Sequence, residues 1–309
     1  MIIYKTNDWL EAIWHFHTGQ AAIALLKRLG SVTLYVSLVT VVQLRYADLR
    51  LTDTPSEYVQ ALGILLSLLL IFRTNTAYDR FYEGRSAWGV LINTSRNLAV
   101  IFNTILPKSA QTDRVFLAKT LCNFAFALKN YLRETPRVDE LDLAEDWQQD
   151  EFESVDNWPN EVVNQLRGRV ERLYAERIIS DAQLINLNDQ INRLLDTSGI
   201  CERIKNTPIP FSYSLFIKFF TVFYLMILPF TMIDSYGYVT IPMMFVTAYF
   251  LIGLEMIGVE VEDPFGMDRN DLPLSQLSQR IRVDVHEVMR QPLAKAEKEA
   301  AKPNFVVVS

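Results

Sequence analysis

Residues that could bind a metal or catalyse a reaction are sparse in this sequence. His15 and His17 form an HxH pair, and His286 stands directly before Glu287. Residues two apart do not share a face of a helix, so the HxH pair is not predicted to bind a metal. His286 and Glu287 are followed by VMR and therefore lack the second histidine of an HExxH zinc motif. No catalytic centre is predicted from these residues.

The composition indicates a protein that lies partly in lipid and partly in water. Of its 309 residues 50% are hydrophobic and 21% are charged, and the net charge is −6. Soluble proteins carry about 25% charged residues. The acidic balance argues against nucleic-acid binding, which needs a basic face. Cys122 and Cys201 lie far apart and outside any CxxC pattern, so neither a disulfide framework nor a zinc site is predicted.

Four apolar segments are predicted to cross a membrane as helices. They are Leu29–Leu44, Tyr58–Phe72, Phe211–Ile233 and Val239–Val259. A spanning helix needs ~20 apolar residues, so the first two are short and are expected to be flanked by other protein. Lys218 interrupts the third segment near one end. An intramembrane lysine is costly, and we expect its ammonium group to reach the interface.

The four segments form two hairpins, which puts both termini on one side of the membrane. Lys27, Arg28 and the arginine-rich stretch after Phe72 lie on that side. Because cytoplasmic segments are enriched in Lys and Arg, both termini are expected to be cytoplasmic. Trp9 and Trp14 favour an amphipathic helix within residues 1–28 that lies at the membrane interface.

The segment Tyr58–Arg85 begins apolar and becomes charged and aromatic without a proline. The nearest prolines are Pro55 and Pro107, so one long helix is predicted to leave the bilayer and continue into the cytosol. The chain then divides into four regions. Residues 1–106 hold the interfacial helix, two membrane helices and this long helix, residues 107–206 a cytosolic helical region, residues 207–263 two further membrane helices, and residues 264–309 a cytosolic C-terminal segment.

The predicted fold class is an all-α membrane protein with four transmembrane helices and a cytosolic helical domain. Hydrophobic periodicity predicts an amphipathic helix at Thr112–Thr135 and helices at Asn160–Arg177 and Asp181–Lys205. The acidic segment Val138–Pro159 is predicted to be mostly loop. A short helix is expected around Asp284–Arg290.

Three motifs together resemble the bestrophin family, and they occur in the family's order. They are TAYDRFYEGRSAWG in the long helix, NTPIPFSY before the third apolar segment, and EDPFGMDRNDLPL after the fourth. The resemblance covers most of the chain and is closest to a bacterial member, which implies the plasma membrane. It also implies a homopentameric ion channel in which the second membrane helix of each subunit lines a narrow neck on the five-fold axis.

The resemblance places the neck at Ile64, Leu68 and Phe72. Their i, i+4, i+8 spacing puts them along one stripe of a helix. Five copies would make stacked apolar rings, and such a constriction gates by dewetting. The resemblance places a second, cytosolic aperture at Ala182, where the family often has a larger apolar residue. Alanine there would leave a wider opening.

Eukaryotic members of the family are calcium-activated anion channels with an acidic calcium-binding run. The matching run here, Met267–Asp271, keeps the two carboxylates of Asp268 and Asp271. These are the candidate metal ligands, although calcium takes 6–8 oxygen ligands. The alternative is that Asp271 caps a helix and Asp268 is solvated. No cofactor is otherwise expected. For a bacterial member the resemblance favours cations over chloride.

Two other classes of function remain open. A membrane scaffold could bind a cytosolic protein partner through the acidic loop and the C-terminal tail. A membrane-embedded enzyme would need intramembrane acid, base or metal-binding residues, and the four apolar segments offer no histidine or paired aspartates. The partners predicted for the channel are inorganic ions, the lipid bilayer and four further copies of the chain.

Overall fold

The fold was analysed in a computed structural model that describes residues 2–4, 20–46, 56–142, 155–268, 270–294 and 306–308. These residues are almost entirely helical, apart from a short parallel pair of strands, β1 (Ile2–Tyr4) and β2 (Val306–Val308). The helices are α2 (Gln20–Arg45), α3 (Ser56–Ile105), α4 (Gln111–Arg133), α6 (Trp158–Ala175), α7 (Asp181–Asn206), α8 (Phe211–Tyr236), α9 (Thr240–Glu262) and α10 (Leu274–Val288), with short 3-10 turns η2 (Val138–Glu140) and η3 (Gly237–Val239).

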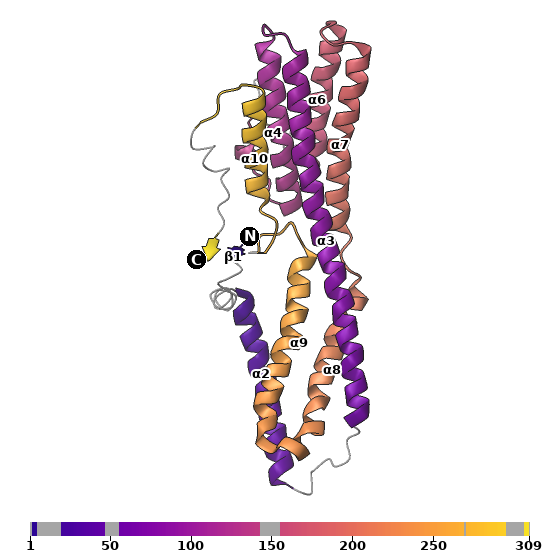
Figure 1. The fold of residues 1–309 in the computed structure, drawn as a ribbon, viewed down its shortest axis with the longest axis vertical. Helices are drawn as coiled ribbons and strands as arrows, with labels where there is room; N and C mark the ends of the chain where they lie inside the picture. Colours follow the sequence, from indigo (N-terminus) through magenta and orange to yellow (C-terminus); the bar gives the residue numbers. More distant parts are fainter. Residues whose placement is uncertain are drawn as a thin grey trace. The chain divides into compact units, whose positions relative to one another are not determined.

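The chain forms two compact units (Figure 1). The apolar unit comprises Ile2–Phe81, Pro208–Asp263 and Val306–Ser309, and contains α2, the first part of α3, α8 and α9. The bundle unit comprises mainly Tyr82–Thr207 and Pro264–Phe305, and contains the rest of α3 with α4, α6, α7 and α10.

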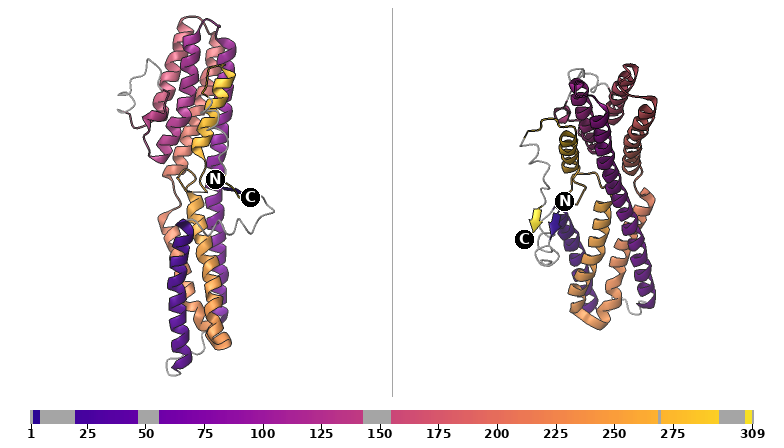
Figure 2. Two further views of the ribbon diagram at one scale, coloured as in Figure 1. Left: turned by 90° about the vertical axis from the view of Figure 1, so that its left-hand side faces the viewer. Right: turned by 45° about the horizontal axis from the view of Figure 1, so that its top comes forward.

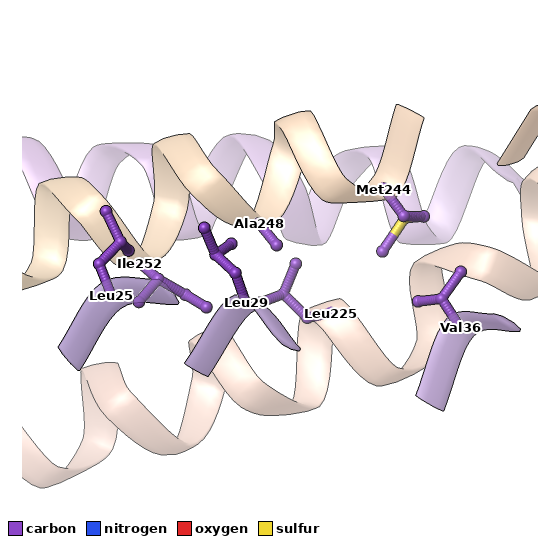
Figure 3. Packing of buried hydrophobic residues seen from close by; sticks show 7 residues of the cluster. All are labelled: Leu25, Leu29, Val36, Leu225, Met244, Ala248 and Ile252. Atoms are coloured by element: carbon purple, nitrogen blue, oxygen red, sulfur yellow. The ribbon is translucent and has the colours of Figure 1, made fainter. Parts of the chain in front are cut away.

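The core of the apolar unit lies where α2 and α9 run side by side, as both views of Figure 2 show. Figure 3 shows the buried residues of this contact, which come from α2, α8 and α9: Leu25, Leu29, Val36, Leu225, Met244, Ala248 and Ile252. The first part of α3 packs instead on α8, through Leu66 and Leu70 against Ile217 and Phe220.

A glycine allows the close approach of α3 and α8. A Cβ at Gly63 would lie 2.5 Å from the hydroxyl oxygen of Tyr224 on α8, closer than any real contact of that kind. The missing side chain therefore makes room for the tyrosine, and the packing fixes which face of α3 is covered.

Within the described residues, three helical stretches are long and apolar enough to cross a membrane: Ile23–Arg45, Ser56–Ile105 and Phe211–Glu262. The turn η3 divides the last of these into α8 and α9, and Gly237 adopts a positive φ of 51° there. The predicted start of the first segment at Leu29 was wrong, because α2 already begins at Gln20 and buries Leu25 against α9.

In the bundle unit, α4 is the central helix. The sequence predicted an amphipathic helix here, but sixteen of its 23 residues are buried, including the polar Asn123, Lys129 and Asn130. The Asn123 side chain makes two hydrogen bonds to the backbone of Asp142: its Nδ2 donates to the carbonyl oxygen, and its Oδ1 accepts from the N–H. The long helix α3 also ends in this unit. Arg114 of α4 donates to the carbonyl oxygen of Asn103 in its last turn and to those of Leu106 and Pro107 just beyond it.

The last helix is longer than the sequence predicted. The predicted segment around Asp284–Arg290 was wrong at its start, because α10 begins at Leu274. Leu274, Ile281 and Val285 recur at helical spacing and are buried. Asp284 accepts a hydrogen bond from Arg96, which attaches α10 to α3. By contrast, the predicted helices at Asn160–Arg177 and Asp181–Lys205 are confirmed within about two residues, a margin that helix ends always carry.

Candidate functional site

The three predicted neck residues lie on an uncovered face of α3. The exposed fractions are 73% for Ile64, 47% for Leu68 and 54% for Phe72, whereas Leu66 and Leu70 between them are buried against α8. The segment is apolar on all sides, so its sequence could not separate these two faces. The fold separates them and leaves an apolar stripe that the other described residues of the apolar unit do not cover.

Arg73, the residue directly after Phe72, lies about 100° further around α3 and faces α9. Arg73 is only 2% exposed, and its Nη1 donates to Glu255 Oε1 on α9 at 3.2 Å. Its Nη2 lies 3.8 Å from Glu262 Oε2. Arg80, about two helical turns further along α3, donates from Nε to the Glu262 carbonyl oxygen at 3.0 Å. The two arginines hold α3 against the end of α9.

Glu255 is the centre of a charge cluster that the sequence reasoning missed. The residue is 5% exposed. Besides Arg73, its carboxylate contacts Arg28 Nη1 of α2 at 3.3 Å and Lys218 Nζ of α8 at 3.8 Å. Four helices of the apolar unit therefore meet at one buried carboxylate. Lys218 was expected to reach the interface, and its half-exposed side chain also faces Glu255.

A signal for this cluster was present in the sequence. Glu255 stands inside the fourth apolar segment, where a carboxylate is costly unless it is paired. Lys218 interrupts the third segment in the same way. The two opposite charges could therefore have been predicted to pair with each other. Glu262 has a related role at the end of α9, where its Oε1 accepts from the backbone N–H of Ile209 and joins the chain before α8 to α9.

The predicted cytosolic aperture lies in the bundle unit. Ala182 is exposed in the first turn of α7, which begins with a capping box formed by Ser180 and Gln183. Ile185, three residues later, is 71% exposed and is a much larger apolar side chain. It lies outside the buried stripe of α7 that includes Leu187 and Ile191, a departure from the pattern that could have marked it.

The candidate metal ligands are arranged around a turn of the loop between α9 and α10. Asp271 is buried, and its Oδ2 accepts from the backbone N–H of Asp268 at 2.6 Å. Asp268 itself is exposed. Burial lowers the pKa of Arg133, and the nearby charges of Asp271 and Glu140 partly offset this. Asp271 is not the N-cap residue of α10, because that position is Pro273, which has no side-chain cap.

Several sequence features fall outside the described residues. These are the HxH pair His15 and His17, the tryptophans Trp9 and Trp14, most of the acidic loop, at residues 143–154, and most of the C-terminal tail. His286 is described and lies on α10, where its Nδ1 is 3.2 Å from the carbonyl oxygen of Pro292.

Comparison with known proteins identifies the family. The sequence profile of the Bacterial/Fungal Bestrophin protein family matches residues 1–287. The chain belongs to the bestrophin family. The resemblance carried by the three sequence motifs is thereby confirmed. The chain is a membrane protein of a family whose named members form ion channels.

Individual bestrophin relatives match most of the chain. A voltage-dependent anion channel-forming protein of Nostoc sp. is 38% identical over 230 residues, which are 73% of this chain and 75% of that protein. The anion channel-forming protein YneE of Escherichia coli (strain K12) is 31% identical over 92% of this chain and 93% of its own length. The solved structure of a bacterial bestrophin homologue from Klebsiella pneumoniae has a TM-score of 0.81 at 26% identity, and covers 87% of this chain and 99% of that one.

Proposed function

We propose that this bestrophin is a pentameric channel for passive ion flux and that Ile64, Leu68 and Phe72 form its gating neck. The observation that carries the proposal is the uncovered apolar stripe on α3. An exposed face of this kind is unfavourable in water, whereas around a five-fold axis the flanks of the stripe contact neighbouring copies. The middle of the stripe, at Leu68, then faces the pore.

The chemistry of the stripe suits a gate. A narrow apolar tube holds water poorly, and a small widening rehydrates it, so small movements of α3 switch conduction. No ionisable side chain is needed for this step. The pairing of Arg73 and Arg80 with α9 supports the proposal, because it fixes the rotation of α3 immediately after the last apolar ring.

Ion flux into liposomes tests the neck. The purified protein should pass monovalent ions, and Leu68→Ala should raise the flux several-fold by widening the middle ring. Leu215→Ala is the matched control, since Leu215 on α8 is 52% exposed compared with 47% for Leu68. Equal flux from both variants, or a monomer in detergent, would contradict the proposal, since one subunit cannot enclose an axial pore.

We further propose that the channel prefers cations. Asp79 is exposed on α3 and lies eleven residues after Leu68, about three helical turns along the same face. Five copies would place a ring of carboxylates beside the neck, and such rings favour cations. The neighbouring cations Arg73 and Arg80 turn toward α9 instead. The names of the relatives point to anions, so the sign needs a direct measurement.

Reversal potentials in asymmetric NaCl decide the sign. Wild type should reverse near the Na⁺ equilibrium potential, and Asp79→Asn should move the reversal toward zero. Asp142→Asn is a suitable control, because it removes a partly exposed carboxylate from the bundle unit. A wild-type reversal near the Cl⁻ potential would assign anion selectivity and reject the role of Asp79.

The remaining features of the proposal concern the membrane. We propose that α2, the first part of α3, α8 and α9 span the bacterial plasma membrane as four helices, with both termini in the cytoplasm. Single cysteines placed beside Tyr46 and Tyr238 should react with a label added from the periplasmic side, which would test this orientation.

We also propose that opening does not require calcium, so that chelation of calcium should change the ion flux by less than about two-fold. A larger loss that Asp271→Asn abolishes would assign a calcium site.

A further inference from the structure

The charge cluster around Glu255 has more positive than negative charge. Arg28, Arg73 and Lys218 face it from three helices, and the only other carboxylate within contact of these cations among the described residues is Glu262. Three cations thus meet two carboxylates, and one positive charge remains uncompensated. An excess positive charge of this kind favours an additional anion.

The excess charge lies at the surface and not in the core. Arg73 and Glu255 are nearly fully buried, with side chains 2% and 6% exposed, whereas the side chains of Arg28 and Lys218 are 53% and 50% exposed. The Lys218 ammonium is 3.8 Å from Glu255, which is too long for a hydrogen bond. Both exposed cations therefore keep donors for a further partner. Both cations contact the same carboxylate group, Arg28 at Oε2 and Lys218 at Oε1.

The surroundings of the two cations are apolar. On α8, Val222 lies one helical turn from Lys218 and is 57% exposed, and on α2, the partly buried Val32 lies one turn from Arg28. The two helices are joined by the hydroxyl of Tyr35, which donates to the Met226 carbonyl oxygen. A ligand held by the cations would therefore have apolar surface on both helices next to it.

We propose that Arg28 and Lys218 bind the phosphodiester group of an anionic phospholipid, with the acyl chains lying along α2 and α8. A phosphodiester carries one negative charge, which matches the excess, and accepts hydrogen bonds from both side chains. The cluster lies toward the end of the apolar unit where α8 begins and α9 ends, as expected of a headgroup-level site. The inference needs the membrane placement of these helices but does not depend on ion flux.

Native mass spectrometry of the full-length protein in a neutral detergent tests the site. Short-chain phosphatidylglycerol should bind more tightly than phosphatidylcholine. Each basic residue near a membrane contributes about 1 kcal/mol of attraction to anionic lipid, so Arg28→Gln and Lys218→Gln should each weaken binding about five-fold, and the double variant about 25-fold. Arg45→Gln is the control, because Arg45 is exposed at the other end of the same helix.

Each other outcome has a clear meaning. Unchanged phosphatidylglycerol binding by the double variant, or equal binding of phosphatidylcholine, would overturn the proposal. Full displacement of the lipid by inorganic phosphate would assign a free-phosphate site in place of a lipid site and would also overturn it. Arg28→Lys keeps the charge and should bind within about three-fold of wild type. This variant therefore separates loss of charge from loss of fold.

Discussion

The two units of this bestrophin arrange polar and apolar side chains in opposite ways. In the bundle unit the central helix α4 is buried along most of its length, and its large apolar residues are covered by neighbouring helices. In the apolar unit many large apolar side chains are exposed, such as Ile64 and Phe219, while Arg73 and Glu255 are buried. The proposed channel would place the exposed apolar residues of the apolar unit against lipid and against neighbouring copies.

This contrast shows where the chain depends on partners. A unit whose charges are inside and whose apolar residues are outside is not stable in water, because both groups are in the wrong solvent. In the proposed pentamer, lipid would cover such a surface on the outside of the channel, and neighbouring subunits would cover it near the axis. The stripe on α3 and the cation pair on α2 and α8 are the two parts of that surface with a specific chemistry.

Removal of the buried carboxylate is expected to have the largest effect on stability. Glu255→Gln takes the 3.2 Å partner from the buried Arg73 guanidinium, and breaking a buried pair costs about 3–5 kcal/mol. With Glu262 still nearby, a loss of about 3 kcal/mol corresponds to a fall in Tm of about 6–12 °C.

The matched control is Glu83→Gln, which breaks the ion pair with Arg203 in the bundle unit. The side chains of Glu83 and Arg203 are 45% and 63% exposed. Ion pairs this exposed contribute about 0–1 kcal/mol to the free energy of unfolding. The Tm of this variant should change by less than about 3 °C. Thermal unfolding in detergent measures both variants. Similar shifts for both would show that the buried cluster does not hold the apolar unit together.

Phe72→Ala is expected to have the next largest effect, and it acts on conduction. Phe72 has the bulkiest side chain of the proposed neck, so its truncation should raise single-channel conductance on the order of ten-fold. The control Phe219→Ala makes the same change at an exposed site on α8, and its conductance should stay within about two-fold of wild type. A larger increase in conductance for Phe219→Ala than for Phe72→Ala would place the constriction elsewhere.

The helical fold was largely predictable from the sequence, because hydrophobic periodicity and the spacing of prolines determine where helices form locally. The long helix α3 follows from the absence of proline between Pro55 and Pro107 and is confirmed at Ser56–Ile105. The start of α10 was missed, since Pro273 stands directly before it and the first turns look like loop. Helix propensity depends on local sequence and does not include the burial of Leu274, which requires contacts with other helices.

The candidate sites were predictable only in part. The positions of Ile64, Leu68 and Phe72 came from the family resemblance, because Tyr58–Phe72 is apolar on every face. Which face stays uncovered depends on contacts with α8 that lie some 150 residues away in sequence. The Glu255 cluster is a similar case, since it joins residues from four helices. Lone charges within apolar segments mark such residues, but not their partners.

The second aperture offers a finer test within the bundle unit. Ala182, assigned by resemblance, and Ile185, with 71% of its side chain exposed, lie one turn apart on α7. If Ile185 narrows the cytosolic exit, Ile185→Ala should raise the flux about two-fold, and Ala182→Gly should leave it unchanged. Flux through liposomes that contain either variant measures this. A drop in flux for Ala182→Leu, with Ile185→Ala inactive, would restore the assignment at Ala182.

The smallest expected effect concerns the interior of the bundle unit. Burial raises the pKa of the Cys201 thiol to about 12, and the charges of Glu202 and Glu83 act in the same direction. The thiolate is the reactive form, so at pH 8 very little of Cys201 should react with iodoacetamide while the bundle is folded. Mass spectrometry before and after denaturation measures the modification at this position. Rapid alkylation in the native protein would show that α7 opens locally, and the bundle would then share the dependence on partners that marks the apolar unit.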